Sequence, residues 1–472
     1  MNDTLVETLS GIRGIYGASL TKEIAKNYAR TYGIFLINKN RGPKRVVVGG
    51  DTRKSTKTLM DIFCKEWLAV GLEVIDVGVA TTPMIELAVR EYRAQGGVII
   101  TASHNEPEFN GWKLLQKSGA ILGVREIEQI IKGARQPGAE KKQSVAKGKL
   151  INKEKDLPER YIKFILRIIG SKSVKKIRQG KFKILVDANG GTGGIIADKL
   201  CKRLGVKMVG VNMRLGQFKR LVVPNKETLA YLTPTINKER ADFGVGLDCD
   251  ADRAEMIIGS ENQAARERGN MVNGHEALAL AIDALKPKGT VVINLPTSHL
   301  VYQVAKKYGA RIKEVDVGET NVVAEMEKQK SLVGGEGSNG GVIVAPGKCR
   351  DGLLNAVLIL KLMAENKQTL PEIISRYPLF FEERKIVRAA KDREKFLKNR
   401  IGEYYKKRGR KIRSAPGVDS GIKILFNQNN WLFFRGSKTE PGVFRIIANG
   451  DDRRLVNRMI LEGEIIFDKL NR

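Results

Sequence analysis

Three aspartates stand at alternate positions in the stretch GLDCDADR: Asp248, Asp250 and Asp252. Neighbouring carboxylates repel one another, so such a cluster usually needs a cation, and hard oxygen ligands favour Mg²⁺ or Ca²⁺. An EF-hand would require glycine at the sixth position and glutamate at the twelfth, where this chain has Arg253 and Gly259. The pattern therefore predicts a magnesium site of another kind, with coordination positions left for a phosphate oxygen.

The same aspartates allow a second interpretation. Asp248 resembles the nucleophile of a haloacid-dehalogenase-like phosphatase, in which a DxDx(T/V) motif also follows a strand. Here Asp252 occupies the Thr/Val position, and the motif lies in the middle of the chain. We therefore keep this chemistry as an alternative to the magnesium site.

A polar loop, TASHNEPEFNGWK, begins at Thr101, places Ser103 beside His104 and ends on Lys113. From the residues alone, Ser103 is either a nucleophile or a turn residue. The loop NGGTGG, which begins at Asn189, lacks the third glycine of a dinucleotide fingerprint and is interpreted as a tight strand-to-helix turn.

Two further loops have the composition of ligand-binding segments. RGSKTEP combines a guanidinium, an ammonium and two hydroxyls, which suits a phosphate dianion. GGEGSNGG combines flexible backbone with a carboxylate and a hydroxyl that could bind sugar hydroxyls. The residues concerned are Arg435, Ser437, Lys438 and Thr439 in the first loop, and Glu336 and Ser338 in the second.

The elements that must position these loops form a repeated pattern. Apolar runs begin at Val46, Lys183 and Thr290, and each is followed by a second apolar run that ends in one of the unusual loops: GVIITASHN, FGVGLDCDADR and SLVGGEGSNG. Helical patterns lie between the two runs of each pair, as in βαβ units with parallel strands. Loops at the carboxyl ends of such strands form ligand crevices. We therefore expect three similar α/β domains in tandem, followed by a smaller α+β domain.

Length and composition agree with several domains. At 472 residues the chain is too long for one core, and the polar segment 133–156 predicts a connection between the first two domains. The expected boundaries give domains at 1–150, 151–260, 261–377 and 378–472. The last of these contains WLFFRGSKTEPGVFRIIA.

The net charge of +31, from 83 Lys+Arg and 52 Asp+Glu, is large enough to attract polyanions. The charge is spread along the chain without interleaved aromatics, so we expect only weak, non-specific nucleic-acid binding and an attraction for small phosphorylated substrates. The start of the chain has no signal-peptide pattern and no run suits a membrane span, which predicts a cytoplasmic protein. Four scattered cysteines are expected to be free thiols.

Taken in order, TASHN, DCDADR, GEGSNG and RGSKTEP resemble the four active-site loops of the α-D-phosphohexomutase family. The resemblance spans nearly the whole chain and includes SGIRGIYG, GDTRKS and NGWK. It implies three related α/β domains and a TBP-like C-terminal domain around a central cleft. It also implies an intramolecular phosphotransferase that interconverts hexose 1- and 6-phosphates and is activated by a hexose 1,6-bisphosphate. We expect a monomer or homodimer.

The resemblance also implies the roles of individual residues. Ser103 would carry the catalytic phosphoryl group and, with the three aspartates, bind Mg²⁺. His104 and Lys113 would serve proton transfer and orientation, and Arg13 and Arg253 would pair with phosphate or its neighbours. Glu336 and Ser338 would bind sugar hydroxyls, and the Arg435 loop would hold the substrate phosphate. A basic scaffold protein with a vestigial site is the non-enzymatic alternative.

Substrate choice rests on loop details. GGEGSNGG followed by RDG resembles archaeal-type mutases assigned to glucosamine phosphate or broad hexose use, so phosphoglucosamine mutase is ranked ahead of a dual phosphomannomutase/phosphoglucomutase. Glu106, Thr320 and Lys438 depart from the residues common in the family. These departures bear on the substrate rather than on the phosphoserine chemistry.

Overall fold

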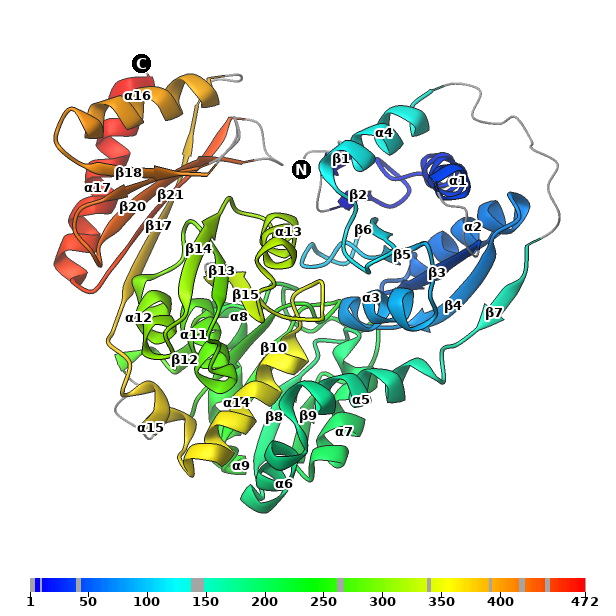
Figure 1. The fold of residues 1–472 in the computed structure, drawn as a ribbon, viewed down its shortest axis with the longest axis horizontal. Helices are drawn as coiled ribbons and strands as arrows, with labels where there is room; N and C mark the ends of the chain where they lie inside the picture. Colours follow the sequence, from blue (N-terminus) through cyan, green and yellow to red (C-terminus); the bar gives the residue numbers. More distant parts are fainter. Residues whose placement is uncertain are drawn as a thin grey trace. The chain divides into compact units, whose positions relative to one another are not determined.

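The computed structural model describes residues 5–8, 11–39, 44–136, 148–260, 267–337, 341–389, 393–415, 421–437 and 442–471. The chain forms two compact units, which are described separately (Figure 1). The first unit comprises residues 1–272 and 343–371, and the second comprises residues 273–342 and 372–472. No helix among the described residues is long and apolar enough to cross a membrane.

The first unit contains two mixed sheets. The larger has seven strands in the order β1-β2-β6-β5-β3-β4-β7, and the smaller has five in the order β12-β11-β10-β8-β9. The first-sheet strands are β1 (Val6–Thr8), β2 (Gly11–Ile15), β3 (Arg45–Gly50), β4 (Glu73–Val79), β5 (Gly96–Ile100), β6 (Phe109–Gln116) and β7 (Leu150–Asn152). The second-sheet strands are β8 (Lys183–Asp187), β9 (Lys207–Val211), β10 (Phe243–Leu247), β11 (Ala254–Ile257) and β12 (Met271–Val272).

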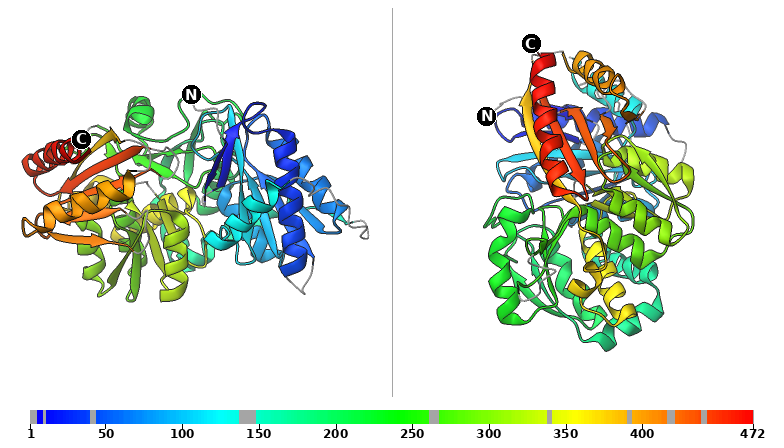
Figure 2. Two further views of the ribbon diagram at one scale, coloured as in Figure 1. Left: turned by 90° about the horizontal axis from the view of Figure 1, so that it is seen from above. Right: turned by 90° about the vertical axis from the view of Figure 1, so that its left-hand side faces the viewer.

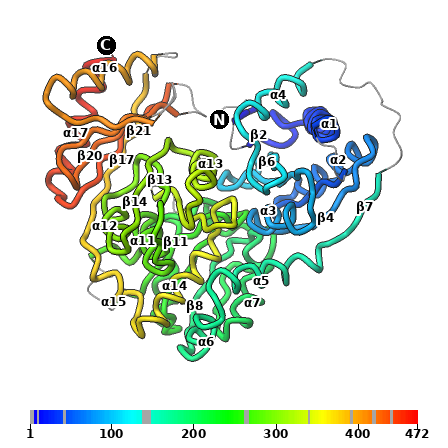
Figure 3. Tube along the Cα trace, viewed as in Figure 1, coloured from blue at the N-terminus to red at the C-terminus, as the bar shows by residue number. Residues whose placement is uncertain are grey.

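Helices cover these sheets and bury their apolar faces against the strands. Those around the first sheet are α1 (Lys22–Lys39), α2 (Thr56–Ala69), α3 (Thr82–Glu91) and α4 (Val124–Ala134). Those of the second domain are α5 (Leu157–Ile169), α6 (Ser171–Gly180), α7 (Gly193–Leu204), α8 (Lys226–Leu229) and α9 (Thr233–Glu239). A late helix, α14 (Gly352–Asn366), packs against α5, α6 and β11 and so belongs to this unit, as its course in Figure 3 allows the reader to follow.

The second unit also contains two sheets. The first has the order β14-β13-β15-β16 and the second is antiparallel with the order β17-β21-β20-β19-β18. The strands are β13 (Thr290–Asn294), β14 (Arg311–Val315), β15 (Val333–Glu336), β16 (Gly341–Val344), β17 (Phe381–Arg388), β18 (Lys411–Ser414), β19 (Ile422–Leu425), β20 (Trp431–Gly436) and β21 (Val443–Gly450). The helices are α11 (Gly274–Leu285), α12 (His299–Lys307), α13 (Glu319–Gln329), α16 (Glu394–Lys406) and α17 (Arg453–Asn471). The short helix α15 (Leu370–Ile374) spans the passage from the first unit to the second.

The C-terminal sheet has apolar side chains on both of its faces. Ile422, Ile424, Leu432 and Phe434 point to one face and form a core with α16 and α17, the two helices visible beside this sheet in Figure 2. Trp431 and Phe433 point to the opposite face and pack with Leu295 of the neighbouring domain. Because strand side chains alternate between faces, β20 contributes side chains to both of these cores.

The structure confirms the expected fold class: three α/β domains and a fourth, antiparallel C-terminal domain. Both strands of each predicted pair are neighbours and parallel, namely β3 with β5, β8 with β10, and β13 with β15. The prediction missed one further parallel strand in each domain. This strand pairs with the other side of the first strand of the pair: β4 with β3, β9 with β8, and β14 with β13. In addition, β7 lies inside the segment predicted as a polar connection and extends the first sheet beside β4.

Candidate active site

Ser103 lies in the loop between β5 and β6, at the carboxyl end of a fully buried strand. Its φ of 52° is left-handed, a costly conformation for a residue other than glycine, and its side chain is 1% exposed. The Ser103 amide donates to Thr101 Oγ1 at 2.8 Å, and its hydroxyl donates to Asp248 Oδ2 at 3.3 Å. The loop thus holds the serine hydroxyl against the first aspartate of the cluster.

Arg53 fixes the backbone of this serine loop. Its guanidinium is buried and donates to Asp51 Oδ2 at 3.0 Å and to the carbonyl of Ser103 at 2.8 Å. It also donates to the carbonyls of Asn105 and Glu106, both at 2.5 Å. One cation therefore satisfies several loop carbonyls that would otherwise be buried without partners.

The three aspartates occupy the loop between β10 and β11. The turn NGGTGG supports this loop: Thr192 donates to the Cys249 carbonyl from its amide at 2.8 Å and from its hydroxyl at 3.0 Å. A Cβ on Gly191 would come within 2.7 Å of the same carbonyl, so glycine is required for the approach. The prediction of a strand-to-helix turn is confirmed, because β8 ends at Asp187 and α7 begins within the motif, at Gly193.

The geometry of the cluster suits a divalent cation. Asp248, Asp250 and Asp252 are almost fully buried, and one carboxylate oxygen from each lies within 4.8 Å of the others. Oδ1 of Asp250 and Oδ1 of Asp252 are buried without a hydrogen-bond partner among the described residues. Buried anionic oxygens without donors are costly unless a cation binds them, so this donor set fits Mg²⁺.

The Oδ2 atoms of Asp250 and Asp252 are contacted by three side chains from other elements. Lys113 Nζ contacts Asp250 Oδ2 at 2.9 Å and Asp252 Oδ2 at 3.1 Å. Thr82 donates its hydroxyl to Asp250 Oδ2 at 2.7 Å, and Arg350 Nη2 contacts Asp252 Oδ2 at 2.8 Å. These contacts orient the two carboxylates and leave their Oδ1 atoms available to a ligand.

Burial and neighbouring charges drive the pKa values of the aspartates apart. The pKa of Asp248 lies well above its usual range, because of burial and because of the charges of Asp252 and Asp250. The pKa of Asp252 lies well below its usual range, because the attraction of Arg350, Lys113 and Arg253 outweighs its burial. Paired carboxylates with divergent pKa values are typical of functional sites.

Arg13 and Arg253 lie close enough to His104 for their charges to act on it. Arg13 donates to Asn105 Oδ1 at 3.2 Å, and burial together with the charge of Arg253 lowers its pKa to about 10. The charge of Arg253, burial and the charge of Arg13 hold the pKa of His104 well below its usual range. Arg253 Nε is buried without a hydrogen-bond partner among the described residues. Like charges held together in this way favour an anion such as a phosphate.

In the second unit, Glu336 ends β15. Its Oε1 accepts from the Gly318 amide at 2.8 Å and from Asn294 Nδ2 at 3.3 Å, which fixes the carboxylate at the carboxyl edge of its sheet. Ser338, the other residue predicted to bind sugar hydroxyls, lies outside the described residues.

Arg435 lies near the end of β20 and Ser437 follows it. The Ser437 amide donates to the Val443 carbonyl at 2.7 Å, which closes the base of the connection to β21. Lys438 and Thr439, predicted to share phosphate binding, lie outside the described residues. Within RGSKTEP, only Arg435, Gly436 and Ser437 belong to the described residues.

The first unit thus brings together Ser103, His104, Lys113, Arg13, Arg253 and the three aspartates, which are far apart in sequence. Arg53, Thr82 and Arg350 also contribute and were not among the predicted site residues. GDTRKS and RDG were noticed only as motifs, and Thr82 gave no signal, because its role depends on a contact across 168 positions.

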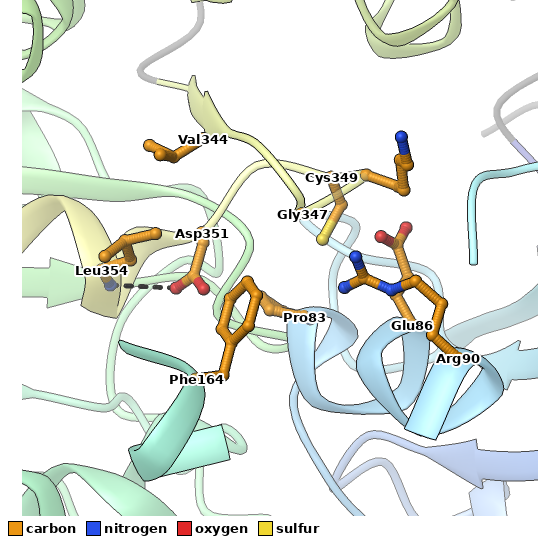
Figure 4. A pocket seen from close by; sticks show the side chains of 10 residues that line it. Pro83, Glu86, Arg90, Phe164, Val344, Gly347, Cys349, Asp351 and Leu354 are labelled. Atoms are coloured by element: carbon orange, nitrogen blue, oxygen red, sulfur yellow. Dashed lines mark hydrogen bonds between the residues drawn. The ribbon is translucent and has the colours of Figure 1, made fainter. Parts of the chain in front are cut away.

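A small cavity lies elsewhere in the first unit, between α3 and the segment that leads into α14 (Figure 4). Phe164, Cys349 and Asp351 help to line it, and Asp351 accepts from the Leu354 amide at 2.9 Å. Burial raises the pKa of Asp351 to about 6. The volume of about 10 Å³ is enough for a single water and far too small for a sugar phosphate.

Comparison with known families gives three matches along the chain. Residues 6–140, 159–261 and 273–380 match the alpha/beta/alpha domains I, II and III of phosphoglucomutase/phosphomannomutase, in that order.

The four cysteines are free and buried, as expected from their spacing.

Individual relatives agree with these matches. A phosphoglucomutase/phosphomannomutase from Thermococcus kodakarensis is 33% identical over 93% of each chain. A probable phosphoglucosamine mutase from Pyrococcus horikoshii is 30% identical over 96% of each chain. The crystal structure of a putative phosphomannomutase from Thermus thermophilus superposes with a TM-score of 0.80 at 22% identity, covering 99% of this chain and 100% of the other.

Proposed function

Because the chain belongs to the α-D-phosphohexomutase superfamily and is a phosphohexomutase, we propose that it interconverts hexose or hexosamine 1-phosphates and 6-phosphates through a phosphoserine at Ser103. The Ser103 hydroxyl, 3.3 Å from a carboxylate of the buried aspartate cluster, is the observation that carries this proposal. The phosphoserine donates its phosphoryl group to the free 1- or 6-hydroxyl of the substrate, which gives a bisphosphorylated sugar. The sugar then turns, and its other phosphate returns to Ser103.

The aspartates and the phosphoserine would bind Mg²⁺ together, through the Oδ1 atoms of Asp250 and Asp252, a carboxylate oxygen of Asp248 and a phosphoryl oxygen on Ser103. When bound, Mg²⁺ supplies positive charge that offsets the negative charge of the transferring phosphoryl group. Arg53 keeps the serine loop in one conformation, so that the Ser103 oxygen stays in line with the accepting hydroxyl.

The remaining residues of the first unit move protons and bind phosphate. His104 is neutral at physiological pH, since its pKa is well below the usual range, and its buried Nδ1 has no partner among the described residues. It can therefore accept a proton or a hydrogen bond from a substrate hydroxyl. Lys113 supplies positive charge beside the aspartates and a donor at Nζ, and Arg13 and Arg253 bind phosphoryl oxygens.

In this proposal, residues of the second unit recognise the sugar. Glu336 and Ser338 bind sugar hydroxyls, and Arg435, Ser437, Lys438 and Thr439 hold the phosphate that is not being transferred. A hexose 1,6-bisphosphate acts as activator, because it can phosphorylate Ser103 when the phosphoryl group is lost. The membership in the phosphohexomutase family removes the support for the haloacid-dehalogenase-like alternative. Against a basic nucleic-acid-binding scaffold with a vestigial site stand Ser103 and the three buried aspartates, which are all present and in contact.

We place glucosamine phosphate first among the substrates and a dual mannose/glucose specificity second. The Glu336 carboxylate could favour an ammonium at the 2-position by charge, although the relatives carry both kinds of name. A site discriminates strongly when the wrong substrate leaves a buried polar group without a partner. A cytoplasmic location, a monomer or homodimer, and weak non-specific nucleic-acid binding remain expectations.

A coupled assay tests the proposal. The kcat/KM values for glucosamine, mannose and glucose 1-phosphates are measured, each with its matching 1,6-bisphosphate. An advantage for glucosamine supports the ranking, whereas an advantage for mannose or glucose reverses it and leaves the mutase mechanism intact. Absence of turnover with all three would contradict the proposed reaction.

A further inference from the structure

The His275 ring packs against the backbone of Gly337, the residue that follows Glu336. The ring belongs to the second residue of α11 and is 5% exposed. A Cβ built on Gly337 would lie 2.4 Å from His275 Nδ1 and 3.0 Å from Thr297 Cγ2. The imidazole therefore packs against the Gly337 backbone itself, and any movement of the ring must move that part of the loop.

The hydrogen bonds of the ring define its tautomer. The Ser298 amide donates to His275 Nδ1 at 3.2 Å, so Nδ1 carries no proton in this arrangement. The proton is then on Nε2, which lies 2.8 Å from Glu382 Oε2 and donates to it. Both ring nitrogens are occupied, so His275 holds its neighbours in place and is not available for proton transfer.

Glu382 is in turn fixed to the C-terminal sheet. Arg384 contacts its other oxygen, with Nε at 2.8 Å and Nη2 at 2.6 Å, and Asn449 Nδ2 donates to Oε2 at 3.4 Å. Burial alone would raise the pKa of Glu382, but the charge of Arg384 and the hydrogen bonds from His275 and Arg384 outweigh it and lower the pKa to about 2. The carboxylate therefore remains charged and paired at any physiological pH.

This sheet contains Arg435, which the proposed function assigns to phosphate binding. Glu382 on β17 lies opposite Asn449 on β21, and β21 pairs along its length with β20, on which Arg435 lies opposite Arg445. The Gly337 backbone thus packs against His275, His275 is hydrogen-bonded to Glu382, Glu382 accepts from Asn449 of β21, and β21 pairs with the strand of Arg435. We call His275 and Glu382 the coupling pair.

We propose that the coupling pair sets the position of the Glu336–Gly337 backbone relative to the strand that carries Arg435, so that the hydroxyls and the phosphate of one phosphohexose are bound at a fixed separation. The inference rests on the proposed function and deepens it. A substrate that binds in two orientations presents its hydroxyls and its distal phosphate at fixed distances in each, so the two binding elements must keep their separation. His275 is a positioning residue in this account.

The experiment measures KM and kcat of the full-length enzyme for the best of the three hexose 1-phosphates. His275→Leu and Glu382→Ala each remove the link, and loss of one buried hydrogen bond raises KM about tenfold while kcat changes by less than about twofold. In His275→Gln the side-chain amide can replace the Nε2–H donor, and KM stays within about threefold of the wild-type value. Glu382→Ala also removes the contacts with Arg384 and Asn449, so the double variant, His275→Leu with Glu382→Ala, is expected to be no worse than Glu382→Ala, because the His275–Glu382 hydrogen bond is already lost there.

Tyr377→Phe is the matched control. The Tyr377 hydroxyl donates to Asp283 Oδ2 at 2.9 Å near the other end of α11, and Tyr377 is not part of the coupling pair. This variant loses a buried hydrogen bond within the same unit but should keep the wild-type KM. If the variants of the coupling pair fold poorly, Glu382→Gln keeps a carbonyl acceptor for Nε2–H and should show an intermediate rise in KM.

The outcomes separate the inference from the proposed function. An unchanged KM in folded variants, or a fall in kcat alone, would overturn the coupling role and leave the mutase intact. If the wild-type enzyme shows no turnover, calorimetric binding of hexose 1-phosphate to wild-type and variant proteins replaces the kinetic readout, with a weaker Kd in His275→Leu expected. A wild-type protein that neither turns over nor binds any of the three hexose 1-phosphates would overturn both.

Discussion

The aspartate cluster of the first unit and the Lys423–Glu314 pair of the second unit are both buried and charged, yet they are built in opposite ways. In the cluster, three carboxylates lie together and two of their oxygens have no donor among the described residues. Lys423 Nζ, by contrast, contacts Glu314 Oε1 at 3.1 Å and lies over the Trp431 ring at 4.7 Å. Buried like charges with some oxygens left without a donor indicate a ligand site, whereas a matched pair packed against an aromatic ring indicates a structural contact.

The largest expected effect comes from Asp250→Asn, because it removes charge from the cluster while keeping an oxygen for Thr82 to contact. We expect kcat to fall about 10²–10³-fold, the size typical for loss of one electrostatic group at a reaction centre. Thermal unfolding should show that the variant is at least as stable as the wild type, since the repulsion within the cluster decreases. A variant with wild-type kcat, or one that is unfolded, would remove the distinction between the two regions.

Lys423→Met should show the opposite pattern. It leaves the partly buried Glu314 with Arg413 as its remaining cationic contact and is expected to reduce the free energy of unfolding by about 3 kcal/mol. Lys385→Met is the control, because the Lys385–Glu464 pair is partly exposed, at 3.5 Å, and should contribute less than about 1 kcal/mol. Denaturant titration measures both. Equal losses in the two variants would show that the buried pair has no special structural role.

Mg²⁺ binding should stabilise the protein by a smaller amount, and this stabilisation should depend on the aspartate cluster and not on the Lys423–Glu314 pair. Mg²⁺ at 100 times its Kd should stabilise the protein by about 2.7 kcal/mol, and EDTA should reverse this gain. The increase in melting temperature should disappear in Asp248→Asn and persist in Lys423→Met. A rise that survives in Asp248→Asn would place the binding site elsewhere.

The pH dependence of the coupling pair gives the smallest effect. The folded-state pKa of Glu382 is about 2, below the usual 4.5, so its charge stabilises the protein fully above pH 4.5 and this stabilisation is lost as the pH falls towards 2. The difference in unfolding free energy between wild type and Glu382→Gln should therefore be largest at neutral pH and smaller at pH 3. A difference that is constant with pH would mean that the charge of Glu382 does not contribute.

Much of the fold could be predicted because its central strands are apolar throughout. VVVGG and FGVGL are buried on both faces and leave a clear signal in the sequence. β9 and β14 were missed because KMVGV and RIKEV lie partly exposed and mix polar with apolar residues. The short strand β7 contains only three residues, too few for a periodic pattern.

The site was predictable to the extent that its residues lie in local motifs. Ser103 and the aspartates follow strands in short, unusual sequences, whereas Arg53 and Thr82 act across long sequence separations. Arg53 looks like an ordinary surface arginine in GDTRKS until the fold places four loop carbonyls around it. His275 lies in none of the four motifs, and only the fold shows that it packs against Gly337 and contacts Glu382.

Intact-mass spectrometry tests the central claim most directly. After incubation with a hexose 1,6-bisphosphate and Mg²⁺, the wild-type protein should gain the mass of one phosphoryl group, and peptide mapping should place it on Ser103. Ser103→Ala should gain no mass and have no mutase activity, although it keeps the fold. A phosphoryl group on another residue, together with full activity of Ser103→Ala, would contradict the account.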